Sequence, residues 1–154
     1  MATSIDIFHS IDISAPARLA YETFTGVDAL PDHLHHVEGV RRRDDHEATW
    51  YVNIAGVRRE FDTVVLDHAD DRFLAWTTTR GPIQHGSITL QELDPHVTRL
   101  GFWMRYEPEG VLETLAKWFG LVERAVGRDL HRVTSMIEQA ALVEATALPE
   151  PLAA

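Results

Sequence analysis

Residues 109–138 read EGVLETLAKWFGLVERAVGRDLHRVTSMIE and carry the clearest fold signal in the chain. Apolar side chains recur in this stretch every three or four residues, at Leu112, Leu115, Phe119, Val122, Val126, Leu130, Val133 and Ile137. This spacing predicts one long amphipathic helix with a single apolar face. A face of that length needs a partner surface from elsewhere in the chain.

The residues before this helix predict a series of antiparallel strands. The first strand has inward-facing positions at Ile5, Ile7, His9, Ile11 and Ile13, which alternate with outward-facing ones. Ser14 and Pro16 then predict the start of a short helix, with Ser14 as its N-cap. Further strands are expected near residues 37–43, 47–54, 58–67, 72–79, 85–93 and 97–106, separated by residues typical of turns.

Composition limits the class of protein. With 154 residues, 45% of them hydrophobic, we expect one domain over residues 1–139 and a frayed or disordered tail over 140–154. The chain has no cysteine, which excludes disulfides, thiol nucleophiles and thiolate metal sites. Because no signal peptide or membrane-spanning apolar run is evident, we expect a cytoplasmic protein without a membrane span. A net charge of −10 argues against nucleic-acid binding, which needs clustered Lys and Arg.

Several motifs together resemble a known superfamily over about residues 5–139. They are IDISAP at 11–16, LP at 30–31, DRFLAW at 71–76, HGSI at 85–88, YEPEG at 106–110 and VGRDL at 126–130. These motifs resemble the START-like (SRPBCC) superfamily, and within it the polyketide cyclase/dehydrase branch. The resemblance implies an α+β helix-grip fold. In such a fold a curved seven-stranded antiparallel sheet wraps around a long C-terminal helix and encloses a cavity.

The resemblance also implies a function. Aromatase/cyclases of this branch fold a poly-β-ketone in the cavity and guide its ring closure and dehydration, although this chain lacks the aromatic residues they typically carry near Leu30 and Val37. We therefore expect a polyketide cyclase or aromatase-like enzyme without a cofactor. Its substrate would be a hydrophobic small molecule, either free or presented by an acyl carrier protein. The alternative is a non-catalytic carrier or sensor of a lipid or secondary metabolite.

Four side chains are candidates for catalysis. Glu123 falls within the apolar stripe of the helix, and a carboxylate facing an apolar cavity suits proton transfer; the alternative is a position at the cavity mouth or a pairing with a basic neighbour. His9 points inward on the first strand, as a proton shuttle or as a structural residue. Arg59 is expected to bind a ketone, carboxylate or phosphate at one end of the cavity, or else to reach water. Tyr106 would assist them.

Strand alternation also predicts which side chains line the cavity. Aromatic surfaces among them suit stacking on a planar ligand, while core packing is the alternative for each. The predicted ligand-binding residues are Trp50, Phe61, Thr63, Trp76, Thr78, Phe102, Met104 and, on the helix, Phe119.

Two further features leave questions open. The histidines near the expected cavity mouth would form a metal site only if they converged, and we predict no metal site there. They are His33, His35, His36 and His46. The outward-facing aromatics Phe8, Tyr51 and Trp103 are a candidate partner surface, so both a monomer and a homodimer remain open.

Overall fold

The structure, a computed structural model, describes residues 4–32, 34–107 and 112–147, without the side chains of 112–116 and 147. Seven strands form one antiparallel sheet in the order β1-β7-β6-β5-β4-β3-β2. No helix in the described part of the chain is long and apolar enough to cross a membrane. The elements are β1 (Ile5–Ile13), α1 (Ala17–Thr25), the 3₁₀ helix η1 (Leu30–Asp32), β2 (Val37–Arg42), β3 (Glu47–Ile54), β4 (Val57–Ala69), β5 (Phe73–Arg80), β6 (Ile83–Asp94), β7 (Val97–Glu107) and α2 (Leu112–Ala147).

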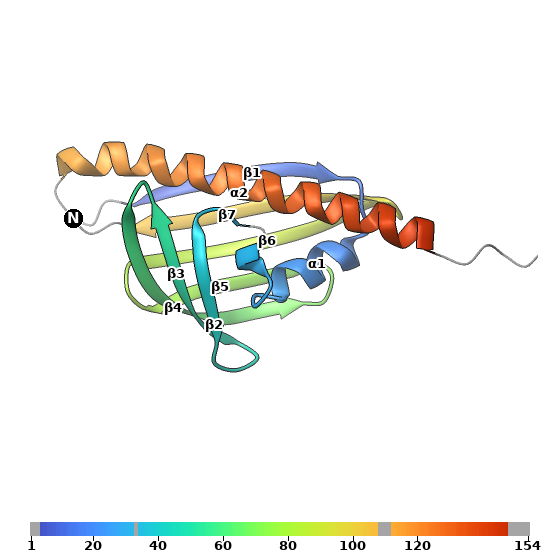
Figure 1. Cartoon of the computed structure of the whole chain (residues 1–154), viewed down its shortest axis with the longest axis horizontal. Helices are drawn as coiled ribbons and strands as arrows, with labels where there is room; N and C mark the ends of the chain where they lie inside the picture. Colours follow the sequence, from blue (N-terminus) through green and yellow to red (C-terminus); the bar gives the residue numbers. More distant parts are fainter. Residues whose placement is uncertain (1–3, 33, 108–111, 148–154) are drawn as a thin grey trace, which may run out of the picture.

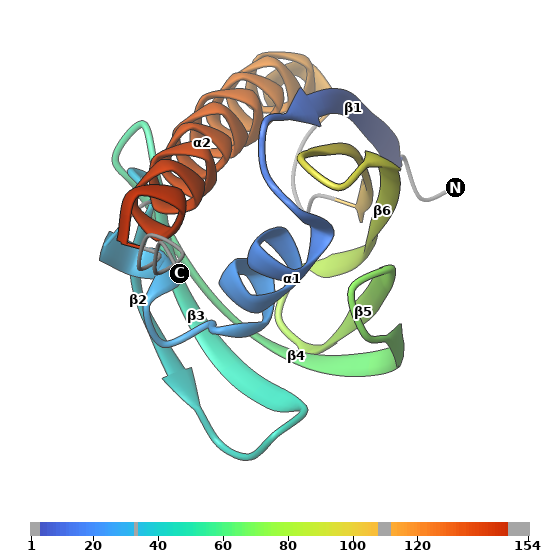
Figure 2. The ribbon, with the colours of Figure 1, turned by 90° about the vertical axis from the view of Figure 1, so that its right-hand side faces the viewer.

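The sheet curves around the helices, and the predicted helix-grip fold is confirmed. Figure 1 shows α2 lying along the length of the sheet. Figure 2, which looks along α2, shows the strands forming an arc with α1 and α2 on its concave side. The alternation of β7 explains the packing, since every second residue from Thr98 to Tyr106 is buried. The most deeply buried large side chains are Ile13, Thr98, Leu100, Val133 and Ile137.

Helix α1 begins later than the sequence indicates. Its N-cap position is Pro16 rather than Ser14, and no side chain caps it. The backbone N–H of Ser14 instead donates a hydrogen bond to Glu138 of α2, over 2.9 Å. The predicted N-cap is therefore wrong, because the chain before α1 is held by the other helix.

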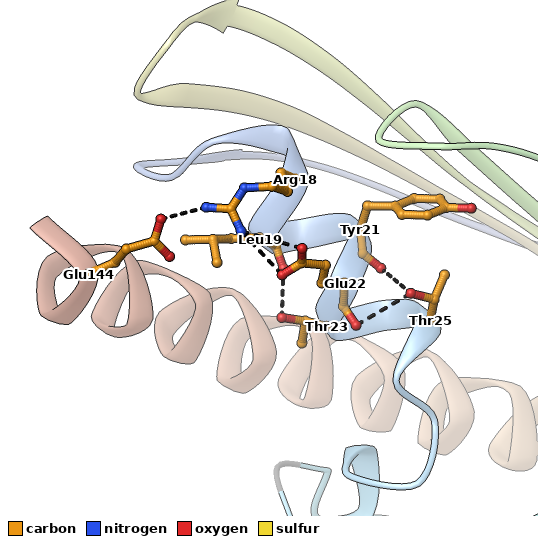
Figure 3. Close-up of polar contacts among 7 residues, drawn as sticks. All are labelled: Arg18, Leu19, Tyr21, Glu22, Thr23, Thr25 and Glu144. Atoms are coloured by element: carbon orange, nitrogen blue, oxygen red, sulfur yellow. Dashed lines mark hydrogen bonds and ion pairs between the residues drawn. The ribbon is translucent and has the colours of Figure 1, made fainter.

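The C-terminal tail begins later than expected, because residues 140–147 belong to α2, which ends at Ala147. Residues 148–154 lie outside the described residues. Figure 3 shows a contact between α1 and this part of α2, in which Arg18 of α1 pairs with Glu22 on its own helix and with Glu144 of α2. At the other end of α1, the Thr25 hydroxyl donates to the Tyr21 carbonyl over 2.8 Å. Helix α1 is thus tied to the C-terminal half of α2.

Asp62 on β4 is a buried carboxylate on the side of the sheet away from the helices. Arg80 and Thr49 donate hydrogen bonds to it over 2.8 Å and 2.7 Å, and Arg43 donates a third over 2.9 Å. These donors, Arg80 first and Thr49 second, lower the pKa of Asp62 from 3.8 to about 2. Because the pKa is lower in the folded state, the ionised group stabilises the fold fully above its unfolded pKa. That stabilisation is lost as the pH falls through about 2.

We expect the stability of Asp62→Asn to depend less on pH in the acid range than the stability of the parent does. The thermal midpoint of the parent, followed by circular dichroism, should fall from neutral pH toward pH 2, and the variant should lose less over that range. Asp12→Asn is the matched control, because Asp12 pairs with Arg99 on the same face but half of its side chain is exposed. Parallel curves for the parent and Asp62→Asn would contradict the prediction.

Candidate functional site

An elongated cavity of about 560 Å³ lies between the concave face of the sheet and the two α-helices. Helix α2 lines it along one side. At a rise of about 1.5 Å per residue, the stretch from Trp118 to Val133 spans about 22 Å. The lining residues of α2 are Trp118, Val122, Ala125, Val126, Asp129, Leu130 and Val133. A space of this shape and lining fits an elongated, largely apolar small molecule.

Aromatic rings form the opposite wall. Trp50 and Phe61 stack across β3 and β4, with ring centroids 6.3 Å apart and planes 8° from parallel. The indole N–H of Trp50 donates to the Thr63 hydroxyl over 2.8 Å, which fixes the ring. Trp76 of β5 lies against Gly86 of β6, where a Cβ atom would come within 2.2 Å of the indole. The absence of a side chain at Gly86 therefore lets Trp76 lie flat on the sheet.

Most of the predicted ligand-binding residues line the cavity, and two do not. Trp50, Phe61, Thr63, Trp76, Phe102 and Met104 are on its wall. Thr78 is absent from the wall, and its hydroxyl accepts the Gln84 N–H over 3.0 Å where β5 turns into β6. Phe119 packs against the hydrophobic core beside the cavity, whereas the neighbouring Trp118 faces the cavity. Trp118 and Phe119 point about 100° apart around the helix axis, and of this pair only Trp118 lines the cavity.

Glu123 and His9 do not line the cavity. Glu123 is exposed, so its expected orientation is wrong; it is one residue beyond Val122, which does face the cavity. His9 points inward as predicted but packs against Gly127 of α2, where a Cβ atom would lie 3.3 Å from its ring. Its Nε2 is buried and has no hydrogen-bond partner among the described residues. The structure therefore does not bring these two groups to the cavity.

Tyr106 and Arg59, the other two catalytic candidates, meet at one end of the cavity around Trp118. The indole N–H of Trp118 donates to the Tyr106 hydroxyl over 3.0 Å. The Arg59 guanidinium carbon lies 5.7 Å from the centroid of the Trp118 ring, a cation–π contact. Arg59 also donates to the Arg58 carbonyl over 3.1 Å. This cluster joins α2, β4 and β7 at the end of the cavity nearest the β3–β4 hairpin.

A carboxylate–imidazole pair on the cavity wall was not predicted. Asp129 of α2 is 8% exposed and accepts the backbone N–H groups of His35 and His36 over 2.9 and 3.2 Å. The His36 ring lies beside it, with Nδ1 3.2 Å from Asp129 Oδ1. That nitrogen is buried and forms no aligned hydrogen bond with any described residue. Asp129 follows Val122 by two helical turns, and this spacing is the sequence signal for its cavity-facing position.

A metal ion has no evident site in the described ranges. No group of three or more His, Asp or Glu side chains there is arranged to hold one. His33, one of the histidines considered as a ligand, lies outside these ranges.

The sequence of this chain matches a known family. The family model for "polyketide cyclase / dehydrase and lipid transport" matches residues 13–132, most of the chain. The chain belongs to this family. One relative with a similar sequence is an uncharacterized 17.2 kDa protein of Streptomyces lincolnensis. It is 31% identical over 131 residues, which cover 84% of this chain and 87% of the relative.

Solved structures similar to this family member include aromatase/cyclases. The Zhui aromatase/cyclase from Streptomyces sp. R1128 superimposes with a TM-score of 0.76 at 18% identity, covering 89% of this chain and 95% of that one. A START superfamily protein from Mycobacterium smegmatis gives a TM-score of 0.68 at 18% identity, covering 88% and 96%. At these identities the likeness concerns the fold, and it agrees with the helix-grip architecture.

Proposed function

We propose that this chain is a polyketide cyclase or aromatase-like enzyme. Its ligand would be an elongated, mostly apolar polyketide or aromatic intermediate held in the cavity, and its reaction cyclisation or dehydration. The observation that supports this most is the pairing of His36 with Asp129 on the wall of a mostly apolar cavity. A histidine held beside a carboxylate on a cavity wall is an arrangement suited to proton transfer.

The proposed chemistry uses the His36 imidazole as a base. A small turn of the His36 ring would align Nδ1–H with Asp129 Oδ1, which lies 3.2 Å away, and that hydrogen bond would leave Nε2 to act as the base. Nε2 takes a proton from a methylene between two ketones, and the resulting enolate attacks a second ketone carbon to form the ring bond. The new alkoxide then receives that proton, and loss of water forms the ring double bond. Every step is redox-neutral.

Tyr106 and Arg59 would bind the far end of the ligand rather than the reacting atoms. Trp118, which contacts both, and Asp129 are separated by about 16 Å along α2 at the helical rise per residue. Tyr106 accepts a hydrogen bond from Trp118, so its own hydroxyl proton remains available for a ligand carbonyl. Binding at a distance from the reaction holds the chain in a reactive conformation, which accelerates ring closure by proximity.

A second candidate function is a carrier of a hydrophobic small molecule, and one observation favours it. Both oxygens of Asp129 accept backbone N–H groups, which is the role of a purely structural carboxylate. In that case His36 would only pack against Asp129, and the cavity would bind its ligand without changing it. The family description includes lipid transport alongside cyclisation.

The first experiment is native mass spectrometry of protein purified from its own host, followed by identification of any bound molecule. The same protein is then incubated with a linear poly-β-ketone thioester of N-acetylcysteamine, and the cyclised products are quantified. An aromatic polyketide ligand and ring closure faster than in buffer would support the enzyme. A bound fatty acid with no acceleration of ring closure would support the carrier and contradict the enzyme.

A further inference from the structure

The solvent-facing side of α2 carries a row of basic side chains. Its members, here called the basic row, are Lys117, Arg124, Arg128 and Arg132, and all four are exposed. At about 100° per residue they lie within about 80° of one another around the helix axis, and they extend over about 22 Å along it. Figure 2 shows that α1 and the sheet lie against the opposite side of α2. The basic row is therefore directed away from the rest of the molecule.

The basic row has no carboxylate partner among the described residues. None of its members forms an ion pair there, whereas Arg99 and Arg105 on the sheet each pair with an aspartate. The same stretch of α2 contains two carboxylates. Glu123 points about 100° away from its neighbour Arg124, and Asp129 is buried toward the cavity. The positive charge of the row is thus left without compensation from the described part of the chain.

This arrangement is unfavourable for the helix by itself. Arg124, Arg128 and Arg132 are four residues apart, and like charges at that spacing repel each other and destabilise a helix. The chain has 24 acidic and 14 basic residues and a net charge of −10, yet no acidic residue lies within the row. A row of positive charge on an acidic protein attracts a negatively charged partner to one place and in one orientation.

We infer that the basic row is the docking site for an acidic α-helix of a partner protein. A helix with carboxylates three or four residues apart presents a straight negative row of matching width. Leu121, which is 37% exposed, lies within the row and provides an apolar contact for such a helix. An anionic membrane fits less well, because the row offers little apolar surface for insertion and the remainder of the chain is acidic. The docking site lies outside the cavity and is independent of the proposed reaction.

The test measures binding of a labelled peptide by fluorescence anisotropy. The peptide is alanine-based, about 20 residues long so that it forms a helix on its own, and carries four glutamates at the spacing of the basic row. We expect the parent to bind it more tightly than an isomer with the glutamates distributed around the helix, and added salt to weaken binding. Replacing Arg124→Glu together with Arg128→Glu should weaken binding by about tenfold. A peptide with lysines in place of the glutamates should prefer this double variant to the parent.

Arg41→Glu together with Arg72→Glu is the matched control, because both arginines are exposed, lie outside α2 and form no ion pair among the described residues. It changes the net charge equally and should leave peptide affinity within a few-fold of the parent. Equal weakening in both double variants, or no preference of the parent for the row peptide, would overturn the inference. Binding of the parent to phosphatidylglycerol vesicles but not to the peptide would overturn it in favour of a lipid surface. If the α2 variant loses helix by circular dichroism, glutamine at both positions carries the same test with a smaller expected loss.

Discussion

Replacing His36 by Gln lowers the rate of ring closure by about 10²–10⁴-fold, the usual contribution of a general base. The amide keeps polar atoms near Asp129 but cannot accept the proton that the reaction releases. Ligand affinity should stay within a few-fold of the parent, since His36 contributes one half-buried ring to a cavity with many apolar walls. Single-turnover kinetics with the poly-β-ketone thioester separate the chemical step from binding.

His35→Gln provides the matched control for this prediction. His35 is the exposed neighbour, its ring makes an edge contact with His36 at 5.1 Å, and it does not line the cavity. Its replacement should leave the rate within a few-fold of the parent. Equal losses in both variants would indicate that the segment is simply disturbed, and no loss in His36→Gln would assign the cavity to a carrier.

The fold was predictable because its signals are local. A strand alternates strictly, so inward positions such as Phe102, Met104 and Tyr106 could be assigned from one known neighbour. In a helix with a broad apolar stripe, the sequence indicates less precisely where each side chain points, because several neighbouring positions fall within the stripe and adjacent side chains are only 100° apart around the axis. For this reason Phe119 and Glu123 were assigned to the cavity, whereas Trp118 lines it.

The candidate site was less predictable because it depends on contacts between distant segments. Asp129 bonds to His36 across 93 residues of sequence, and no local pattern reports that contact. It arises because the segment between η1 and β2 lies against the middle of α2. His9 illustrates the converse, since its inward direction was predicted but its packing against Gly127 could only come from the structure.

Replacing Asp129 by Ala should destabilise the protein by about 2–4 kcal/mol. The substitution leaves the N–H groups of His35 and His36 without their acceptors, and because both hydrogen bonds are only partly buried, each loss should cost about 1–2 kcal/mol, in the lower part of the range for a buried donor. Asp129→Asn retains one acceptor oxygen and should cost roughly half as much. Urea denaturation measures the free energy of unfolding, and an unchanged m-value would confirm that the denatured state is comparable.

Glu138→Ala gives the control on the same helix, because Glu138 also accepts a backbone N–H, from Ser14, but at an exposed site. Its replacement should cost less than about 1 kcal/mol, since water replaces the lost partner.

The two Asp129 variants then separate the structural role of Asp129 from its role in catalysis. An Asn variant that remains folded but loses ring closure assigns Asp129 to positioning His36. An Ala variant as stable as the parent would show that the bonds to the 35–36 backbone contribute little, and it would remove the structural argument for the carrier.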